Sequence, residues 1–180
     1  LLKEYVDQGY EVWLELGLQS ASDKTLKRIN RGHKFSAYQD AVERASAFGI
    51  KVCSHLIIGL PGEQLAESMY TLEQVLNHPV DGLKLHPLHI VNGSTMAKAW
   101  QANRIDVLEM TEYANIAGEL IRHTPKDIIL HRVSATAHKD VLLAPSWCLL
   151  RWPSINEVCR NLDAHGGQGA ALADKYQYQK

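Results

Sequence analysis

Short apolar segments with polar residues on one side alternate along the chain with longer segments that place apolar residues at helical spacing. The short segments predict four strands, at residues 11–18, 51–58, 82–90 and 128–133. The longer segments predict helices at residues 1–9, 23–29, 36–48, 63–77, 95–102, 107–123 and 154–162. Ser22 and Ser36 are the expected helix caps, and Ser154 is expected to start the last helix. Strands that alternate with helices predict an α/β fold with parallel strands and right-handed crossovers.

The stretch at residues 51–63 combines a buried strand with a sharp turn. Its apolar run has the length expected for a strand buried on both faces, and the sequence GLPG follows at residues 59–62. Glycine and proline together predict a tight strand-to-helix turn, where the backbone can approach a ligand closely. Counting in twos along the strand places Cys53, His55 and Ile57 on one face.

Polar side chains also occupy one face of the other strands. The residues expected to share this inward side with His55 are Glu15, Gln19, Lys84, His86 and His131. Four strands are too few for a closed eight-stranded barrel of ~250 residues, which leaves an open doubly wound sheet or half of a barrel. Ligand sites in barrels assemble at the carboxyl ends of the strands. The inward polar residues therefore favour the parallel-stranded half of a partial TIM-like (β/α)6 barrel.

Composition and charge are those of an ordinary globular chain. Of the 180 residues, 46% are hydrophobic and 22% are charged, which suits one domain with a sizeable core. The net charge of −1 creates no overall field that would attract nucleic acid or an anionic membrane. No window approaches the ~18 apolar residues of a membrane span. Cys53, Cys148 and Cys159 are too far apart for a disulfide framework or a structural zinc site, which suggests a reducing cytoplasm.

Several spaced blocks resemble one enzyme family. Residues 15–20 (ELGLQS) and 26–33 (LKRINRGH) resemble the E-x-G-x-Q-S … L … R-x-H block of radical S-adenosylmethionine enzymes. Residues 59–63 (GLPGE) look like the G-x-P-G-[EQ] turn of these enzymes, and residues 92–95 (NGST) resemble a loop that closes one of their strands. The resemblance covers residues 11–153. Within the family, these blocks resemble an uncharacterised bacterial branch that is related to oxygen-independent coproporphyrinogen oxidase and the Elongator catalytic subunit.

The resemblance implies a binding site for S-adenosylmethionine. Arg31 would offer its guanidinium fork to the methionine carboxylate of the cofactor. Gln19 would hydrogen-bond the same amino-acid end or the ribose. His55 stands where many relatives have an aspartate that binds the ribose hydroxyls, and a neutral imidazole accepts only one of them. Ile57 and the backbone of Leu60 would border the adenine.

The resemblance also implies a substrate side and a cluster. Glu15, Lys84 and His86 would lie deeper or toward the substrate, with no chemical role assigned. The family holds a 4Fe-4S cluster through the thiolates of a C-x3-C-x2-C motif near the N-terminus. The three cysteines of this chain have neither that spacing nor that place. No metal ligand is therefore assigned here.

On this resemblance the chain divides into residues 1–153, the C-terminal half of a radical S-adenosylmethionine barrel, and residues 154–180, a helix and a loose tail. It is expected to be a fragment that is inactive alone and lacks the N-terminal cluster-binding half. The expected partners are that missing half, an electron donor, and a second copy paired through an exposed sheet edge. The family also modifies tRNA and tetrapyrroles, but the net charge gives an RNA substrate no support.

Two other function classes stay open. His55, His86 and His131 fall at matching positions of three strands, as the ligands of a metal-dependent barrel hydrolase can, and His89 follows closely. The second class is a non-catalytic barrel that only binds partners.

Each candidate residue also has a purely structural interpretation. On this interpretation, Glu15 and Lys84 would form an ion pair across the barrel, and Arg31 would be a solvated residue at the end of a helix. His55 would be a core residue with its hydrogen bonds satisfied.

Overall fold

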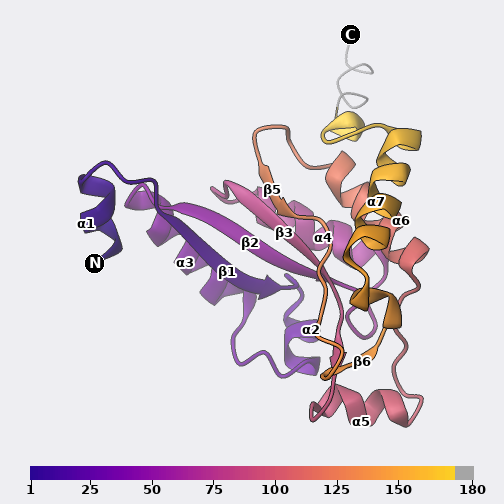
Figure 1. Cartoon of the computed structure of the whole chain (residues 1–180). Coiled ribbons are helices and arrows are strands. Elements are labelled where there is room, and N and C mark those ends of the chain that lie inside the picture. The colour runs from indigo at the N-terminus through magenta and orange to yellow at the C-terminus, as the bar shows by residue number, and fades with distance from the viewer. Residues whose placement is uncertain (173–180) are drawn as a thin grey trace.

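One parallel sheet forms the centre of the computed structural model, which describes residues 1–172 (Figure 1). The strand order is β1-β2-β3-β5, so neighbours in the sheet follow one another along the chain. The strands are β1 (Trp13–Gln19), β2 (Lys51–Ile58), β3 (Gly82–Pro87) and β5 (Ile129–Arg132). Four parallel strands in sequential order confirm the predicted α/β fold and are consistent with part of a barrel.

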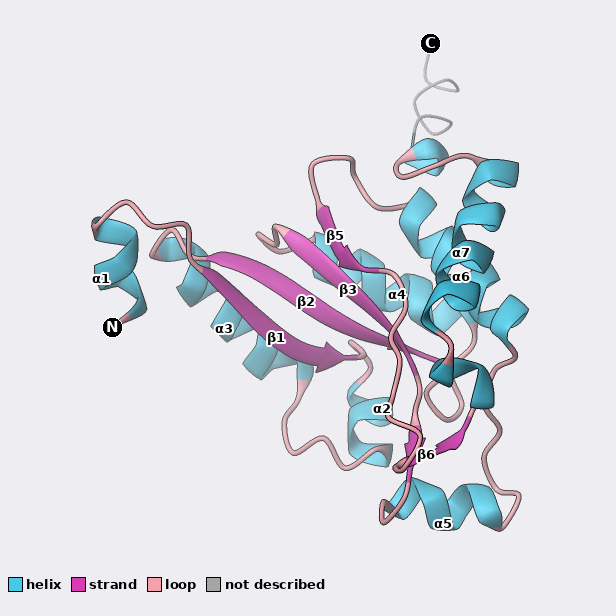
Figure 2. Cartoon of the chain, viewed as in Figure 1, coloured by secondary structure: helices cyan, strands magenta, loops and turns pink. Residues whose placement is uncertain are grey.

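Helices α3, α4 and α6 pack against one face of this sheet (Figure 2). The helices are α1 (Leu2–Asp7), α2 (Asp23–Arg28), α3 (Phe35–Ala47), α4 (Leu65–Leu76), α5 (Thr95–Gln101), α6 (Met110–Arg122) and α7 (Arg151–His165). Helix α7 packs on α6, farther from the sheet. None of the described helices is both long enough and apolar enough to cross a membrane.

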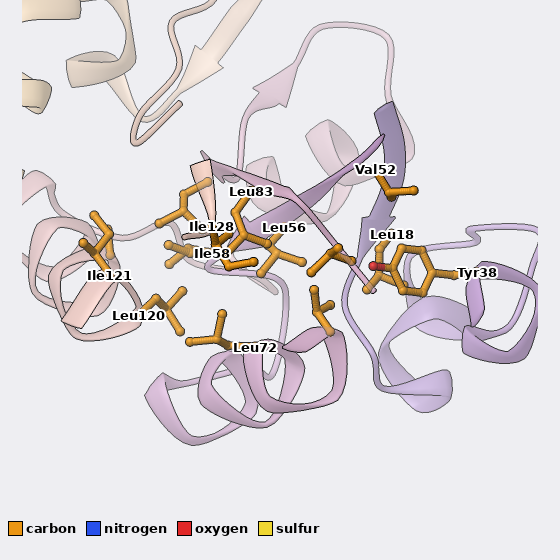
Figure 3. Packing of buried hydrophobic residues seen from close by; sticks show 14 of the residues in the cluster. Leu18, Tyr38, Val52, Leu56, Ile58, Leu72, Leu83, Leu120, Ile121 and Ile128 are labelled. Carbon is orange, nitrogen blue, oxygen red and sulfur yellow. The ribbon is translucent and has the colours of Figure 1, made fainter. Parts of the chain in front are cut away.

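The side chains between the sheet and these helices form the main hydrophobic core (Figure 3). On β2 they are the alternate residues Val52, Leu56 and Ile58, each at most 2% exposed. Leu72 of α4 and Leu120 of α6 meet them from the helix side. Burying one such side chain stabilises the fold by about 1.5–3 kcal/mol. Since strand side chains alternate, the residues between them face the inner side of the sheet.

The first predicted helix cap is confirmed and the second is wrong. Ser22 caps α2, because its hydroxyl accepts the N–H of Thr25. Ser36 does not cap α3, which begins one residue earlier, at Phe35. The N–H of Phe35 donates instead to the carboxylate of Asp23 at 2.8 Å. The cap is therefore supplied by a residue of another helix.

The C-terminal part of the chain is more ordered than predicted. Helix α7 begins before the predicted Ser154, which is buried inside it. Residues 166–172 are not a loose tail, because the side-chain amide of Gln168 donates to the carbonyls of Pro125 at 2.6 Å and Ile128 at 2.7 Å. The rest of the predicted tail lies outside the described residues.

The third predicted strand ends at Pro87, as expected of a residue that cannot donate to the ladder. The chain then forms β4 (Ile90–Val91), which pairs antiparallel with β6 (Leu142–Ala144), and a 3-10 helix at Ser146–Leu149 follows. This small sheet was not predicted, because such short strands leave no readable alternation.

Strand β1 is an edge of the main sheet. Within residues 1–172 it pairs only with β2, so the backbone groups along its other side have no strand partner. An edge of this kind is a template for another strand.

Candidate functional site

Three neighbouring strands bring a connected set of polar side chains to the inner face of the sheet. One carboxylate oxygen of Glu15 on β1 accepts a hydrogen bond from Nζ of Lys84 on β3. The other oxygen lies 3.1 Å from Nε2 of His55 on β2. His55 and Lys84 are register partners, so Glu15 reaches across β2 to both. We call Glu15, His55 and Lys84 the inner-face cluster; its ion pair is the one expected between Glu15 and Lys84.

The charges in the inner-face cluster fix the hydrogen-bonding roles of His55. The hydrogen bond from Lys84 lowers the pKa of Glu15, which keeps the carboxylate ionised. Burial, followed by the charge of Lys84, lowers the pKa of His55 and favours the neutral ring. A carboxylate can only accept, so Nε2 of the neutral ring carries the proton and Nδ1 is left as an acceptor. His55 can therefore accept a hydrogen bond from one hydroxyl group.

The side chains of Arg31 and Gln19 both approach Gly17. The Nε and Nη2 atoms of Arg31 donate to the carbonyl of Gly17 at 3.2 and 2.6 Å. A Cβ on Gly17 would lie 3.0 Å from Nη2 of Arg31 and 3.2 Å from Nε2 of Gln19. Gln19 has a φ of +80°, a left-handed conformation that is strained for a residue with a side chain. We call these three residues the arginine–glutamine cradle, because the missing side chain of Gly17 lets both polar groups come close to the backbone there.

The two residues predicted beside an adenine differ in exposure. Ile57 is half-buried on β2 and is the register partner of His86. Leu60 is only 2% exposed, and its side chain packs in a second small core with Leu88 and Ile90. Leu60 can therefore offer only backbone to a ligand, which is the role predicted for it.

A buried carboxylate joins the turns that follow β1 and β2. The hydroxyl of Ser20 donates to Oε1 of Glu63 at 2.6 Å, and Thr71 accepts the N–H of Ala21 at 3.1 Å. Ser20 is fully buried and Glu63 is 6% exposed. We call Ser20, Glu63 and Thr71 the turn clasp. Sequence reasoning gave these residues no role, although a polar residue directly after a strand was the available signal.

Replacing Ser20 by alanine is expected to lower the free energy of unfolding by about 2 kcal/mol, because the buried carboxylate of Glu63 loses its donor. Urea unfolding followed by circular dichroism measures the change. The matched control is Ser36→Ala, which removes an exposed hydroxyl, and it is expected to change little. Equal losses in the two variants would contradict a stabilising role for the turn clasp.

His131 lies at the amino-terminal end of the inner face. Its ring packs edge-on against Trp13, with centroids 4.5 Å apart. Its Cδ2 atom is only 2.8 Å from the place that a Cβ on Gly82 would take. Trp13 and Gly82 begin their strands, so this contact is far along the strands from the carboxyl ends.

The structure does not assemble the three histidines of the alternative hydrolase. His55 contacts Glu15, and His86 packs against His89 with ring centroids 4.5 Å apart. His131 stays beside the start of the strands. Over residues 1–172, no group of three or more histidine, cysteine, aspartate or glutamate side chains is placed to hold a metal ion. The ligand geometry of a zinc hydrolase is therefore missing from the described residues.

His89 should make stability depend on pH. Burial, followed by the neighbouring His86, lowers the pKa of His89 to about 4, and its Nε2 is buried without a hydrogen-bond partner among the described residues. In the unfolded chain, the pKa of His89 is ~6.5. As pH falls, the unfolded state therefore binds a proton on His89 before the folded state does, and stability is lost from ~6.5 toward 4.

The expected loss from His89 is at most about 2 kcal/mol, because partial exposure screens the effect. His89→Phe keeps a ring and cannot titrate, so its free energy of unfolding should depend less steeply on pH over this window. Urea unfolding of both proteins at several pH values measures the difference. If the free energies of unfolding of the two proteins change with pH in parallel, His89 is not responsible for the pH dependence of stability.

The cysteines do not fit a 4Fe-4S cluster. Cys53 and Cys148 are buried, and burial raises the pKa of their thiols to about 11 and about 12. Cys159 is exposed on α7 and stands alone. Cluster iron needs several thiolates together, so within the described residues this chain offers no cluster site.

Comparison with known proteins identifies the family. The model of the radical SAM superfamily matches residues 1–75, and the model of the Radical_SAM C-terminal domain matches residues 80–164. The chain is similar to protein YhcC of Escherichia coli (strain K12), with 60% identity over 172 residues, 96% of this chain and 56% of that protein. It is also 31% identical to YtqA of Bacillus subtilis (strain 168) over 165 residues, 92% of this chain and 51% of that protein.

More distant relatives share the name Elongator complex protein 3. The human protein is 25% identical over 123 residues, 67% of this chain and 22% of that protein. The structure of Elp3 from the archaeon Methanocaldococcus infernus, with residues 1–46 deleted, matches 92% of this chain and 39% of its own chain. That match has a TM-score of 0.73 at 18% identity, which shows a shared fold.

The chain spans about half the length of the curated relatives it matches first. Both family models match in chain order, and between them they reach from the first residue to α7. The motif residues that they cover include the arginine–glutamine cradle and the turn clasp, which the fold brings to the ends of adjacent strands. The chain belongs to the radical S-adenosylmethionine superfamily.

Proposed function

We propose that this chain is the part of a radical S-adenosylmethionine enzyme that binds the methionine and ribose ends of the cofactor. In such enzymes, bound S-adenosylmethionine supplies a 5′-deoxyadenosyl radical and methionine when one electron breaks its sulfur–carbon bond. The observation that carries the proposal is the arginine–glutamine cradle, because it brings a guanidinium and an amide, two polar groups suited to an amino acid, together at Gly17, where a Cβ would crowd both.

Each cofactor-binding role follows from the donors and acceptors that the side chain offers. The Arg31 fork would bind the methionine carboxylate, since guanidinium matches carboxylate geometry. Gln19 would bind the same end or the ribose, and Nδ1 of His55 would accept from one ribose hydroxyl. Ile57 and the backbone of Leu60 would border the adenine, which suits a half-buried apolar side chain beside a sharp turn.

The substrate would meet the remaining inner-face residues. Glu15 and Lys84 supply one negative and one positive group, and His86 lies farther along β3. Burial lowers the pKa of His86, which favours a neutral ring that can donate and accept. These groups can orient a polar substrate on the open face of the sheet.

The cluster ligands would come from another part of the full-length protein. Three observations support this proposal. The relatives are longer than this chain, residues 1–172 contain no cluster site, and the edge of β1 has no strand partner within those residues. We infer that residues 1–153 form the C-terminal half of the barrel and that the other half completes the sheet at β1. An electron donor would serve the whole enzyme. A second copy of the chain could pair with the β1 edge where the other half is missing.

The cytoplasm is the proposed location. The three cysteines are free, and their thiols do not approach one another as a disulfide requires. Free thiols of this kind are typical of a reducing compartment.

Anaerobic reconstitution tests the proposal. The full-length protein that carries this chain is purified without oxygen, and its iron and sulfide are assayed. Reductant and S-adenosylmethionine are then added, and 5′-deoxyadenosine is sought by mass spectrometry. We expect a 4Fe-4S cluster and 5′-deoxyadenosine from the full-length protein.

Residues 1–180 alone are the control, and they are expected to yield neither the cluster nor 5′-deoxyadenosine, because they lack cluster ligands. A full-length protein that takes up no cluster after reconstitution would contradict the proposed function. Zinc would then be the next metal to assay.

A further inference from the structure

A cavity of about 490 Å³ lies between the end of β5 and the start of α7. Arg132 of β5 and Arg151 of α7 line it, together with the hydroxyl-bearing residues Ser134 and Thr136. Within residues 1–172, no acidic residue lines this cavity. In Figure 1 the segment that leaves β5 descends beside the orange first part of α7. We call this space the β5–α7 cavity.

The two arginines of the β5–α7 cavity have no ion-pair partner among the described residues. Within residues 1–172, no carboxylate forms an ion pair with Arg132 or Arg151, whereas Arg160, farther along α7, pairs with Glu157 at 2.8 Å. The guanidinium of Arg151 lies 5.3 Å from the ring of Trp152. A cation at this distance from an aromatic ring is attracted by it, and the N–H groups of an arginine can still donate to an anion.

The start of α7 adds to the positive potential. Helix α7 is 15 residues long, and its N-cap, Leu150, makes no side-chain cap hydrogen bond. The amino end of such a helix carries a partial positive charge, and here it offers the N–H groups of Arg151 and Trp152, since Pro153 has none. Two arginines without an ion-pair partner among residues 1–172 therefore line one polar cavity at this helix end, an arrangement suited to a phosphate group.

The place of the cavity connects it with the inner-face cluster. Arg132 is the register partner of Lys84, so the cavity begins beside that cluster. The positive charge of Arg132 also contributes, after burial, to the lowered pKa of His86. A molecule held in the cavity could therefore extend over the inner face.

We propose that the β5–α7 cavity binds a phosphate group of the substrate through Arg132 and Arg151. This inference rests on the proposed function, and it narrows the substrate to a phosphate-bearing molecule. The remainder of that molecule then lies toward the inner-face cluster. Carboxyl ends of barrel strands are where phosphate sites commonly form.

Calorimetric titration of inorganic pyrophosphate into the full-length protein tests this inference. Arg132→Gln and Arg151→Gln are each expected to weaken binding about tenfold, and the double variant should bind with no measurable affinity. Arg160→Gln removes an equal charge from the same helix, outside the cavity, and is expected to bind as the unaltered protein does. Equal affinities in all four variants and the unaltered protein would overturn the proposal.

Further probes distinguish phosphate from other anions and identify its source. Succinate bound as tightly as pyrophosphate, with the same dependence on Arg132, would overturn the phosphate assignment. Tighter binding of a nucleoside monophosphate supports a small phosphomonoester, whereas tighter binding of a short RNA without terminal phosphates supports phosphodiester groups. The absence of 5′-deoxyadenosine from the unaltered protein would contradict the proposed function, while the pyrophosphate comparison would still decide this inference.

Discussion

Replacing Arg31 by glutamine is expected to weaken binding of S-adenosylmethionine about 100-fold in the full-length, cluster-loaded protein. A guanidinium fork on a carboxylate makes two charge-assisted hydrogen bonds, and their loss costs about 3 kcal/mol. Arg31 already contacts the carbonyl of Gly17 through Nε and Nη2, which holds its fork in one orientation beside Gln19. Equilibrium dialysis with labelled cofactor measures the affinity, and 5′-deoxyadenosine formation should fall with it at subsaturating cofactor.

Two further variants separate the guanidinium from its charge. Lys27→Gln removes one positive charge from an exposed position on α2, close in sequence to Arg31, and is expected to leave cofactor affinity unchanged. Arg31→Lys keeps the charge and loses the planar fork, so an intermediate loss of about tenfold is expected. Equal losses in Lys27→Gln and Arg31→Gln would show that net charge alone matters and would contradict the assigned role of Arg31.

The strands and their faces could be predicted because burial imposes a period of two on them. Val52, Leu56 and Ile58 face the helices, and His55 lies between them on the inner face. The same rule placed Glu15 and Lys84 on that face, where they pair. A side chain has only two directions along a strand, so a readable alternation fixes which residues can meet.

Contacts between distant segments could not be predicted in this way. Ser20 and Glu63 are 43 residues apart in the chain, and local spacing carries no information about their hydrogen bond. Similarly, Ser36 is an ordinary cap residue, but Asp23 from the preceding helix supplies the cap of α3. Arg31 and Gln19 were paired through the family resemblance, since composition and periodicity give no reason for them to meet.

The position of His131 shows how one irregularity changes a site. Leu83 pairs with Leu130 and Lys84 pairs with Arg132, so a bulge leaves His131 as the extra residue of β5. Sequence periodicity does not mark such a bulge. His131 consequently lies beside Trp13 at the amino end of the sheet, away from His55 and His86, and cannot join them as a metal ligand.

The contact of His131 with Gly82 makes a side chain at this glycine costly. Replacing Gly82 by valine is expected to lower the free energy of unfolding by about 3 kcal/mol, with a fall of roughly 6–12 °C in melting temperature. A Cβ there would lie 2.8–2.9 Å from the His131 ring and 3.1 Å from the carbonyl oxygen of Ile129. The backbone of β5 cannot retreat without losing its pairing with β3.

A double-variant cycle separates this collision from the general effect of replacing a glycine. Gly167→Val is the matched control, because a Cβ at Gly167 meets nothing within 4 Å, and it is expected to change the melting temperature little. In a His131→Ala background, the loss of unfolding free energy caused by Gly82→Val should shrink to less than half, since only the contact with Ile129 remains. If Gly82→Val destabilises the His131→Ala protein as much as the unaltered one, the contact with the ring does not cause the loss of stability. The close approach of β3 and β5 at their backbones would then be the reason that this strand begins with glycine.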